Sequence, residues 1–376
     1  MNLVKILIFF LLSTLLFLSC TEVSEKSAKE NYSNKSESND SVPIEEPEPE
    51  SESESEPNIN LTLLKEKNDK RIFPKVINLK DLQNTDFAIT LENKLSDSKN
   101  VIYASSLVFA WDKLNKIFKS PLILDSSCSN DFKLLYKSDS YKGSLHKDEY
   151  QAEAIVRNES IIIKAFYKKS LPFLMPFHSI NKGVVFNNIR VKAFGIKSYE
   201  LGLNQQIEIL YYEDDNHFVL KLKPIYTEHE IFLIKGFSPK HSFSDLLNLM
   251  NKLIDIGKKE KKTRLNRCKY EIKTNDILTI PIINFNIETN YESMINQHFI
   301  CNNRYYTIDS AYQRTAFILD EYGAEVESVA LFPAEAPCKP KKLVFNKPFV
   351  IYLKRKDNKY PYFALKVVDT ELMLPK

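Results

Sequence analysis

Residues 21–60 contain too few apolar side chains to fold on their own. They carry 12 acidic residues and three lysines, a net charge of −9. Such a segment cannot bury enough apolar surface to offset the entropy lost on ordering, and its like charges favour an extended chain. We therefore expect a disordered acidic tether, which confines the folded core to residues 61–376.

The first 19 residues have the pattern of an export signal. One lysine precedes an apolar run over residues 6–18, and Ser19 and Cys20 follow. The run is shorter than the roughly 20 residues that span a bilayer, and it suits the core of a signal peptide. The ending resembles the bacterial lipobox in the looser form that spirochaetes use, although Phe17 and Leu18 depart from the usual pattern. The resemblance implies a lipoprotein signal peptide over 1–19, a lipid on Cys20, a tether over 20–60 and a protein anchored in the cell envelope at the outer membrane. The alternative is an ordinary secretory signal that ends at a cysteine.

The remaining 316 residues hold 48 basic and 37 acidic side chains, a net charge of +11. A chain of this length can bury a large core. The excess of lysine could attract acidic partners such as an acidic polysaccharide or lipid headgroups, and we expect no nucleic-acid partner. It could equally reflect an AT-rich genome, because lysine, asparagine and isoleucine are all abundant.

Apolar spacing predicts three helices. The segments 86–95 and 107–118 each place apolar residues on one face. A third helix is expected to begin after Ser242, where Asp245 completes a capping box, and to stop at Gly257.

Runs rich in β-branched and aromatic residues predict strands over 161–167, 207–212, 218–222, 277–283 and 317–319. At the C-terminus, 349–353 and 362–368 should form a buried hairpin across the charged turn 355–359. Several runs are apolar at successive positions, which is typical of strands covered on both faces. The chain is therefore expected to be an α+β protein with a large central, mostly antiparallel sheet, additional sheets and helices near its N-terminus.

The C-terminal string resembles the end of a serpin. FNKPF at 345–349 matches that family's F-N-x-P-F strand, and ALKVV at 364–368 resembles its last strand. Four further segments resemble serpin elements in the family's order: DFAITLENKLSDSKNVIYASSLVFAWDKL, IIIKAFYKKSLPFLMPF, IEILYYEDDNHFVLKLKP and ILTIPIINFNIETNYESMI. Finally, DEYGAEVESVA resembles the hinge of the reactive-centre loop. The resemblance covers about 290 residues.

The resemblance implies a bait mechanism, in which a cleaved loop inserts into the main sheet as a new strand. It assigns the hinge to Glu321, Gly323, Ala324 and Glu325. With a period of two, Ala324, Val326, Ser328 and Ala330 share one face, and their small size is compatible with burial in a sheet. The family's count from the hinge glycine places the reactive bond at Pro337–Cys338.

Other features argue against inhibition. Proteases rarely cut after proline, and Pro333, Pro337 and Pro340 each lack the N–H that a strand ladder needs. The loop is also about four residues shorter than in inhibitory serpins. Three departures concern the residues that let the family's sheet open: the S-P-x-S turn reads Ala104-Ser105-Ser106-Leu107, Lys164 replaces a bridging asparagine, and no histidine occurs in QRTAFILDEYG. The segment between 118 and 161 is too short for the family's flap and its heparin-binding helix.

Other motifs give weaker signals. A basic run (Lys258, Lys259, Lys261, Lys262, Arg264 and Arg267) could bind an acidic partner or could be a solvated connection. Four cysteines (Cys128, Cys268, Cys301 and Cys338) could form two disulfides or stay as free buried thiols. His178, His217 and His229 lack metal-binding spacing, and Glu213, Asp214 and Asp215 crowd an expected turn. Neither a catalytic motif nor a cofactor motif occurs, so we do not expect an enzyme.

These observations favour a non-inhibitory, serpin-like lipoprotein that binds an unknown protein partner and is held to the membrane by its lipid. Two alternatives stay open. One is a serine-protease inhibitor that acts by loop insertion, and the other is a structural envelope protein without a soluble ligand.

Overall fold

The two C-terminal apolar runs form the centre of the fold, as the sequence predicts. β19 (Phe349–Arg355) and β20 (Pro361–Val367) are antiparallel neighbours, and every residue of β20 is buried. They lie in a seven-stranded sheet, the second sheet, in the order β11-β12-β13-β19-β20-β3-β2. Its other strands are β11 (Ile207–Asp214), β12 (His217–Leu222), β13 (His229–Lys235), β3 (Asn100–Ala104) and β2 (Thr85–Ala88).

The computed structural model describes residues 72–197, 201–236, 242–263, 266–322 and 339–376, which belong to one compact unit. The predicted signal peptide and tether lie outside these residues. Within them, the helices are α2 (Ser106–Phe118), α3 (Asn130–Lys137), α4 (Leu201–Gln205) and α5 (Phe243–Lys261), with 3-10 turns η1 (Leu79–Asp81) and η2 (Arg267–Tyr270). None of these helices combines the length and the apolar character that a membrane crossing requires.

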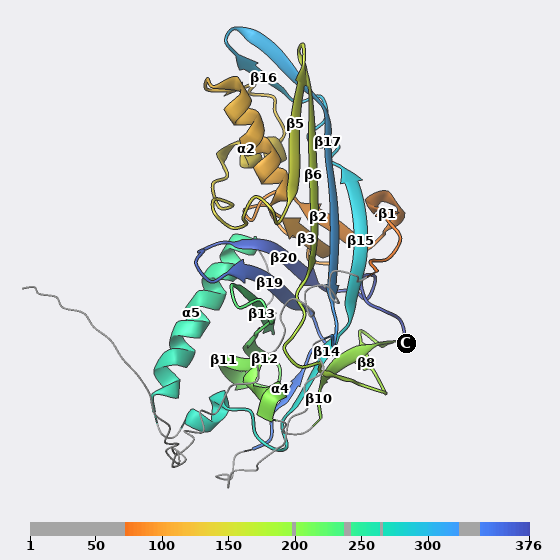
Figure 1. Cartoon of the computed structure of the whole chain (residues 1–376), viewed down its shortest axis with the longest axis vertical. Coiled ribbons are helices and arrows are strands. Elements are labelled where there is room, and N and C mark those ends of the chain that lie inside the picture. The colour runs from red at the N-terminus through yellow and green to blue at the C-terminus, as the bar shows by residue number, and fades with distance from the viewer. Residues whose placement is uncertain (1–71, 198–200, 237–241, 264–265, 323–338) are drawn as a thin grey trace, which may run out of the picture. The chain divides into compact units, whose positions relative to one another are not determined.

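The longest strands form the main sheet. In Figure 1 these strands run along the vertical long axis of the view. At its centre, β17 (Arg304–Leu319) pairs in parallel with β6 (Ser160–Ser170) on one side and antiparallel with β15 (Ile283–Asn290) on the other. The remaining strands are β5 (Gln151–Arg157), β1 (Ile77–Asn78), β16 (His298–Cys301) and β4 (Ile123–Leu124). Most pairings in this sheet and in the second sheet are antiparallel, which confirms the predicted α+β class with a large, mostly antiparallel sheet.

Two smaller sheets complete the described chain. One has the order β18-β14-β10-β7, and the other pairs β8 with β9. Their bounds are β18 (Lys342–Val344), β14 (Ile277–Pro281), β10 (Ala193–Ile196), β7 (His178–Ser179), β8 (Val184–Phe186) and β9 (Ile189–Val191). The predicted strand 277–283 is thus divided between two sheets, because the chain leaves β14 at Pro281 and enters β15 at Ile283.

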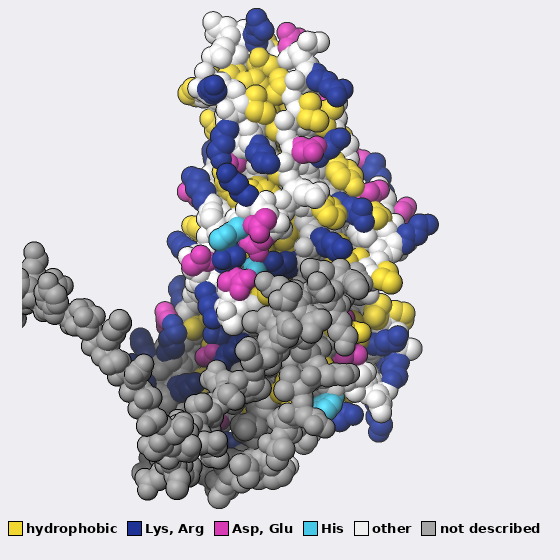
Figure 2. All heavy atoms as spheres, viewed as in Figure 1, with side chains coloured by type: hydrophobic (Ala, Val, Ile, Leu, Met, Phe, Trp, Pro, Cys, Tyr) yellow, Lys and Arg dark blue, Asp and Glu magenta, His cyan; other side chains and the backbone are white. Residues whose placement is uncertain are grey.

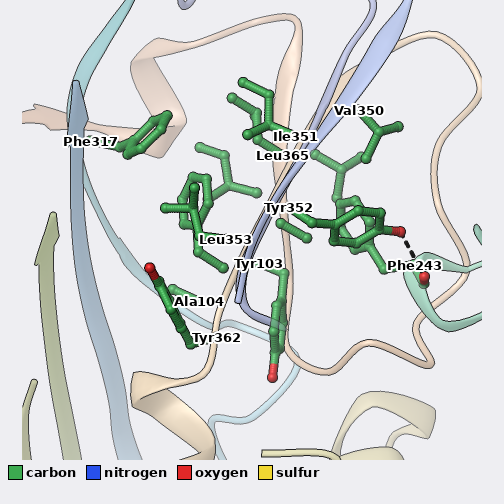
Figure 3. Close-up of a cluster of buried hydrophobic side chains, with 14 of the residues drawn as sticks. Tyr103, Ala104, Phe243, Phe317, Val350, Ile351, Tyr352, Leu353, Tyr362 and Leu365 are labelled. Carbon is green, nitrogen blue, oxygen red and sulfur yellow. Dashed lines mark hydrogen bonds between the residues drawn. The ribbon is translucent and has the colours of Figure 1, made fainter. Parts of the chain in front are cut away.

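The core lies on both faces of the second sheet (Figure 3). On one face, Phe363 of β20 packs against Phe317 of the main sheet, with ring centroids 4.6 Å apart. On the other face, Tyr352 of β19 contacts Phe243 at the start of α5, and its hydroxyl donates to the Phe243 carbonyl at 2.7 Å. Burying an aromatic side chain contributes about 1.5–3 kcal/mol, so this double coverage explains why both strands are apolar at successive positions.

The predicted helix over 86–95 is wrong. Residues 85–88 form β2, which pairs in parallel with β3, and the chain then turns. The Asn93 side chain accepts a hydrogen bond from the Thr90 backbone N–H at 2.8 Å and holds this turn. Leu91 and Leu95 are buried as the spacing required, but the turn buries them without a helix.

The other two predicted helices are present. α5 begins at the expected capping box of Ser242 and Asp245. It does not stop at Gly257, however, and continues to Lys261. A Cβ at Gly257 would lie 1.9 Å from the Leu210 carbonyl oxygen, so this glycine permits the close approach of β11 to the helix. The sequence analysis missed α3, whose N-cap Ser129 accepts from the Phe132 N–H.

Candidate functional site

The expected loop begins where β17 ends, and β17 pairs in parallel with β6, so a strand formed by that loop could enter beside β17 only by opening the ladder between these two strands. We call this ladder, from Ser160–Thr307 to Ser170–Ile318, the seam. It joins the two strands directly in parallel over eleven residue pairs, with one irregularity between Ile308 and Ser310. A strand can enter here only if these backbone hydrogen bonds break, and the side chains on either face determine how costly that is.

On the inner face, Gln313 ties the seam to the start of α2. Its side-chain nitrogen donates to the Ser106 hydroxyl at 3.1 Å, to the Thr315 hydroxyl at 3.2 Å and to the Ala104 carbonyl at 3.3 Å. Its side-chain oxygen accepts from the Tyr291 hydroxyl at 2.6 Å. Gln313 is 1 % exposed, so these bonds form in a low-dielectric setting, where an unpaired polar group is costly.

This network fills the positions at which the sequence departs from the serpin pattern. Ser106 occupies the altered turn, and Gln313 opens the run QRTAFILDEYG, which has no histidine. Sequence reasoning noted both departures but missed that the two side chains bond each other. Lys164 is not part of this network: it is exposed on the outer face, opposite Glu153 of β5 and Tyr312 of β17.

The loop leaves β17 through a fixed corner. The carbonyls of Glu321 and Tyr322 accept from the backbone N–H groups of Phe177 and Phe173, at 2.9 and 3.0 Å. Phe173 is buried, and its ring meets that of Phe177 with centroids 4.7 Å apart. Glu321 is the only predicted hinge residue that the structure describes. Gly323, Ala324 and Glu325, together with Pro337 and Cys338 of the predicted reactive bond, lie outside the described residues.

The chain is fixed again where the description resumes. Lys341 is 3 % exposed and forms an ion pair of 2.7 Å with the fully buried Asp276. Asp276 also accepts from the Lys341 backbone N–H at 2.6 Å. Removing one partner of such a buried ion pair is strongly destabilising. The pair therefore fixes the position at which the chain enters β18 after the loop.

A charged cluster lies beside the end of β6, in a cavity of about 770 Å³. The Glu149 carboxylate accepts from Lys169 at 2.8 Å, contacts His229 Nε2 at 3.0 Å and meets Arg355 at 3.2 Å. Burial alone would raise the pKa of Glu149, but hydrogen bonds from His229, the His146 backbone and Lys169 hold it well below its usual range. Figure 2 shows acidic, basic and histidine side chains gathered midway along this face.

The predicted basic run lies at the end of α5 and in η2. Lys258 pairs with Asp255 at 3.2 Å and Arg267 pairs with Glu271 at 2.8 Å, so acidic neighbours offset part of the charge. Lys259, Lys261 and Lys262 are exposed, and Arg264 lies outside the described residues. The described part of the run can therefore meet an acidic partner only by point-charge attraction.

Three of the four cysteines considered for disulfides are free thiols: Cys128, Cys268 and Cys301. A pairing among these three is therefore wrong, and Cys338 lies outside the described residues. Cys128 and Cys301 are buried, as expected of structural thiols. The described residues contain no group of three or more His, Cys, Asp or Glu that could hold a metal ion. His217 contacts Asp214 at 3.1 Å, within the turn predicted at 213–215.

Neither a family model nor a curated protein matches the chain. Among solved structures, Serpin48 from Tenebrio molitor aligns at 15% identity and a TM-score of 0.29, covering 55% of each chain. Serpin-12 from Manduca sexta aligns at 14% identity and a TM-score of 0.36, covering 73% of this chain and 69% of that one. SRPN18 from Anopheles gambiae aligns at 9% identity and a TM-score of 0.40, covering 73% and 93%. The chain thus spans about half the length of Serpin48.

Proposed function

We propose that this chain is a non-inhibitory, serpin-like binding protein, anchored to a cell envelope through a lipid on Cys20. The observation that carries the proposal is the closed seam. β6 and β17 pair directly along eleven residue pairs, and Gln313 bonds to α2 beneath them. The loop adds Pro333, Pro337 and Pro340, which cannot donate to a ladder.

The proposal is tested with a panel of serine proteases of different specificity. The full chain is incubated with each protease and analysed on denaturing gels. We expect cleavage without a covalent complex, because a loop that does not insert cannot trap the acyl-enzyme. A denaturant-resistant adduct with any member of the panel would establish inhibition instead.

Protease inhibition is the second candidate because the loop follows β17 directly. β17 ends at Leu319, two residues before the hinge residue Glu321, so the loop could fold back beside it. The small residues Ala324, Ser328 and Ala330 could lie in a buried row. The adduct experiment separates the two candidates directly.

A binding role needs a partner, and the exposed lysines of α5 favour an acidic one. Lys259, Lys261 and Lys262 supply three neighbouring charges. Immobilised heparin serves as the probe. Retention that is lost at about 0.3 M salt, and lost in a variant with these three lysines changed to glutamine, would support an acidic polysaccharide. Absence of retention, together with failure to capture any envelope or host component, would favour a structural envelope protein.

The anchor is tested separately. The Cys20→Ala variant should release the protein from the membrane fraction and lose the added lipid mass from its N-terminal peptide. An unmodified N-terminus in the parent protein would indicate an ordinary secretory signal.

A further inference from the structure

The first described residues cross the outer face of the main sheet. The Phe73 ring lies beneath Lys168 of β6, whose ammonium is 4.6 Å from the ring centroid. The next residue, Pro74, accepts a hydrogen bond at its carbonyl from the Asn286 side chain of β15, at 2.8 Å. Two adjacent residues therefore contact strands on opposite sides of β17.

The strand register shows that these contacts share one row. Lys168 is opposite Ala316, and Ala316 is opposite Asn286. Residues directly opposite each other lie on the same face of a sheet, so the row runs from β6 over β17 to β15. Ala316 is 1 % exposed, and its small side chain leaves room for a chain that passes above the seam.

Both ends of this crossing are held. Beyond Pro74, Ile77 and Asn78 form β1, which pairs in parallel with Ile287 and Glu288 of β15. Asn286 is itself fixed, because its side-chain oxygen accepts from Arg314 of β17 at 2.9 Å. The Arg314 guanidinium in turn lies 5.2 Å from the Phe166 ring of β6.

We propose that residues 73–78, which we call the strap, clamp the seam shut. Inserting a strand would move β6 away from β17 and β15 by about 4.8 Å. Successive Cα atoms are fixed at about 3.8 Å, so Phe73 and Pro74 cannot stay on Lys168 and Asn286 while the strands part. Opening of the seam requires release of the strap first.

The strap also links the seam to the N-terminal segment that precedes it in the chain. The inference rests on the proposed function, since it names what keeps the seam closed, but it is measured by a different property.

The test is hydrogen exchange on the full chain, read at peptides covering 166–170 and 314–318. The Phe73→Ala variant removes the contact with β6. The Asn286→Asp variant keeps an acceptor for Arg314 but loses the donor to Pro74. We expect each to speed exchange in these peptides by about tenfold or more, with β12 and β13 unchanged. Phe118→Ala is the control, because its half-buried ring packs on Phe299 and Tyr306, away from this row.

Unchanged exchange at the seam in both strap variants would overturn the proposal. Faster exchange that is equal at the seam and in β12 and β13 would also overturn it, because that pattern reports global destabilisation. The same variants are then incubated with the protease panel. Faster seam exchange without an adduct supports both proposals, whereas faster exchange with an adduct supports the strap and overturns the non-inhibitory function.

Discussion

The Gln313 side chain donates to the Ser106 hydroxyl at 3.1 Å and thereby joins the middle of β17 to the first residue of α2. Both groups are buried. The bond fixes the seam from below, as the strap is proposed to do from above. Widening the seam at this point would break the Gln313 hydrogen bonds and leave buried polar groups unpaired, which is costly.

Replacing Gln313 with leucine should therefore destabilise the protein by about 2–4 kcal/mol, because the change leaves the Tyr291 hydroxyl and several acceptors unpaired. Urea unfolding measures this loss. The control is Gln151→Leu on the exposed edge strand β5, which should change stability by about 0.5 kcal/mol or less. Equal effects of the two changes would show that the Gln313 network is unimportant.

Two buried tyrosines give a matched comparison (Figure 3). The Tyr352 hydroxyl donates to the Phe243 carbonyl at 2.7 Å, whereas the Tyr103 hydroxyl has no hydrogen-bond partner among the described residues. Tyr352→Phe should cost about 1–2 kcal/mol, and Tyr103→Phe should be neutral or stabilising, because only the first removes a bond. Thermal unfolding of the two variants measures both effects. A larger loss of stability in Tyr103→Phe than in Tyr352→Phe would contradict the proposed role of the Tyr352 hydrogen bond.

The Glu149 cluster predicts acid sensitivity. The pKa of Glu149 is lowered in the folded state. The stabilisation that its carboxylate gives to the folded protein is therefore complete above pH 4.5, the pKa of this group in the unfolded chain. It is lost as the pH falls through the folded value. Glu149→Gln leaves Lys169 and Arg355 without their partly buried carboxylate and should cost about 1.5–3 kcal/mol at pH 7, the usual range for hydrogen bonds to charged groups. The difference in free energy of unfolding between the parent protein and the variant should narrow as the pH falls from 5 to 3. If the two unfolding free energies instead change in parallel with pH, the carboxylate is excluded as the cause of the acid sensitivity.

Lys235 predicts that stability rises with pH in the alkaline range as well. Burial, followed by the nearby charge of Lys347, lowers the pKa of Lys235 to about 8. Its ammonium donates to the Val344 carbonyl at 2.6 Å. Below pH 8 the folded protein must bury a charge; between pH 8 and 10.5 it loses this proton before the unfolded chain does, so its stability rises. Relative to Lys235→Met, the parent protein should gain stability from pH 7 to 9.5. A constant difference would refute the lowered pKa.

The elements predicted correctly from the sequence are those whose pattern is local. The hairpin of β19 and β20 is apolar at successive positions, and α5 carries its own capping box at Ser242. The helix expected over 86–95 failed because the same apolar spacing suits a strand followed by a turn, and pairing with β3 decides between them. Gly257 gave a stop signal that close packing on Leu210 overrides.

The site depended on contacts that no local pattern contains. Gln313 and Ser106 are far apart in the chain, and each was visible only as a departure from the serpin pattern. Phe73 gave no signal at all, because its meaning comes from the register that brings Lys168, Ala316 and Asn286 into one row. The Glu149 cluster likewise joins β6, β13 and β19.

The most direct test of the closed seam is the melting temperature of the full chain before and after a single proteolytic cut between Ala330 and Lys342. If β6 and β17 stay paired, the cut chain should melt within about 5 °C of the intact one, because roughly 1 kcal/mol or less has changed. A rise of about 20 °C or more would mean that the freed segment has entered the sheet as a new strand, and it would contradict the account.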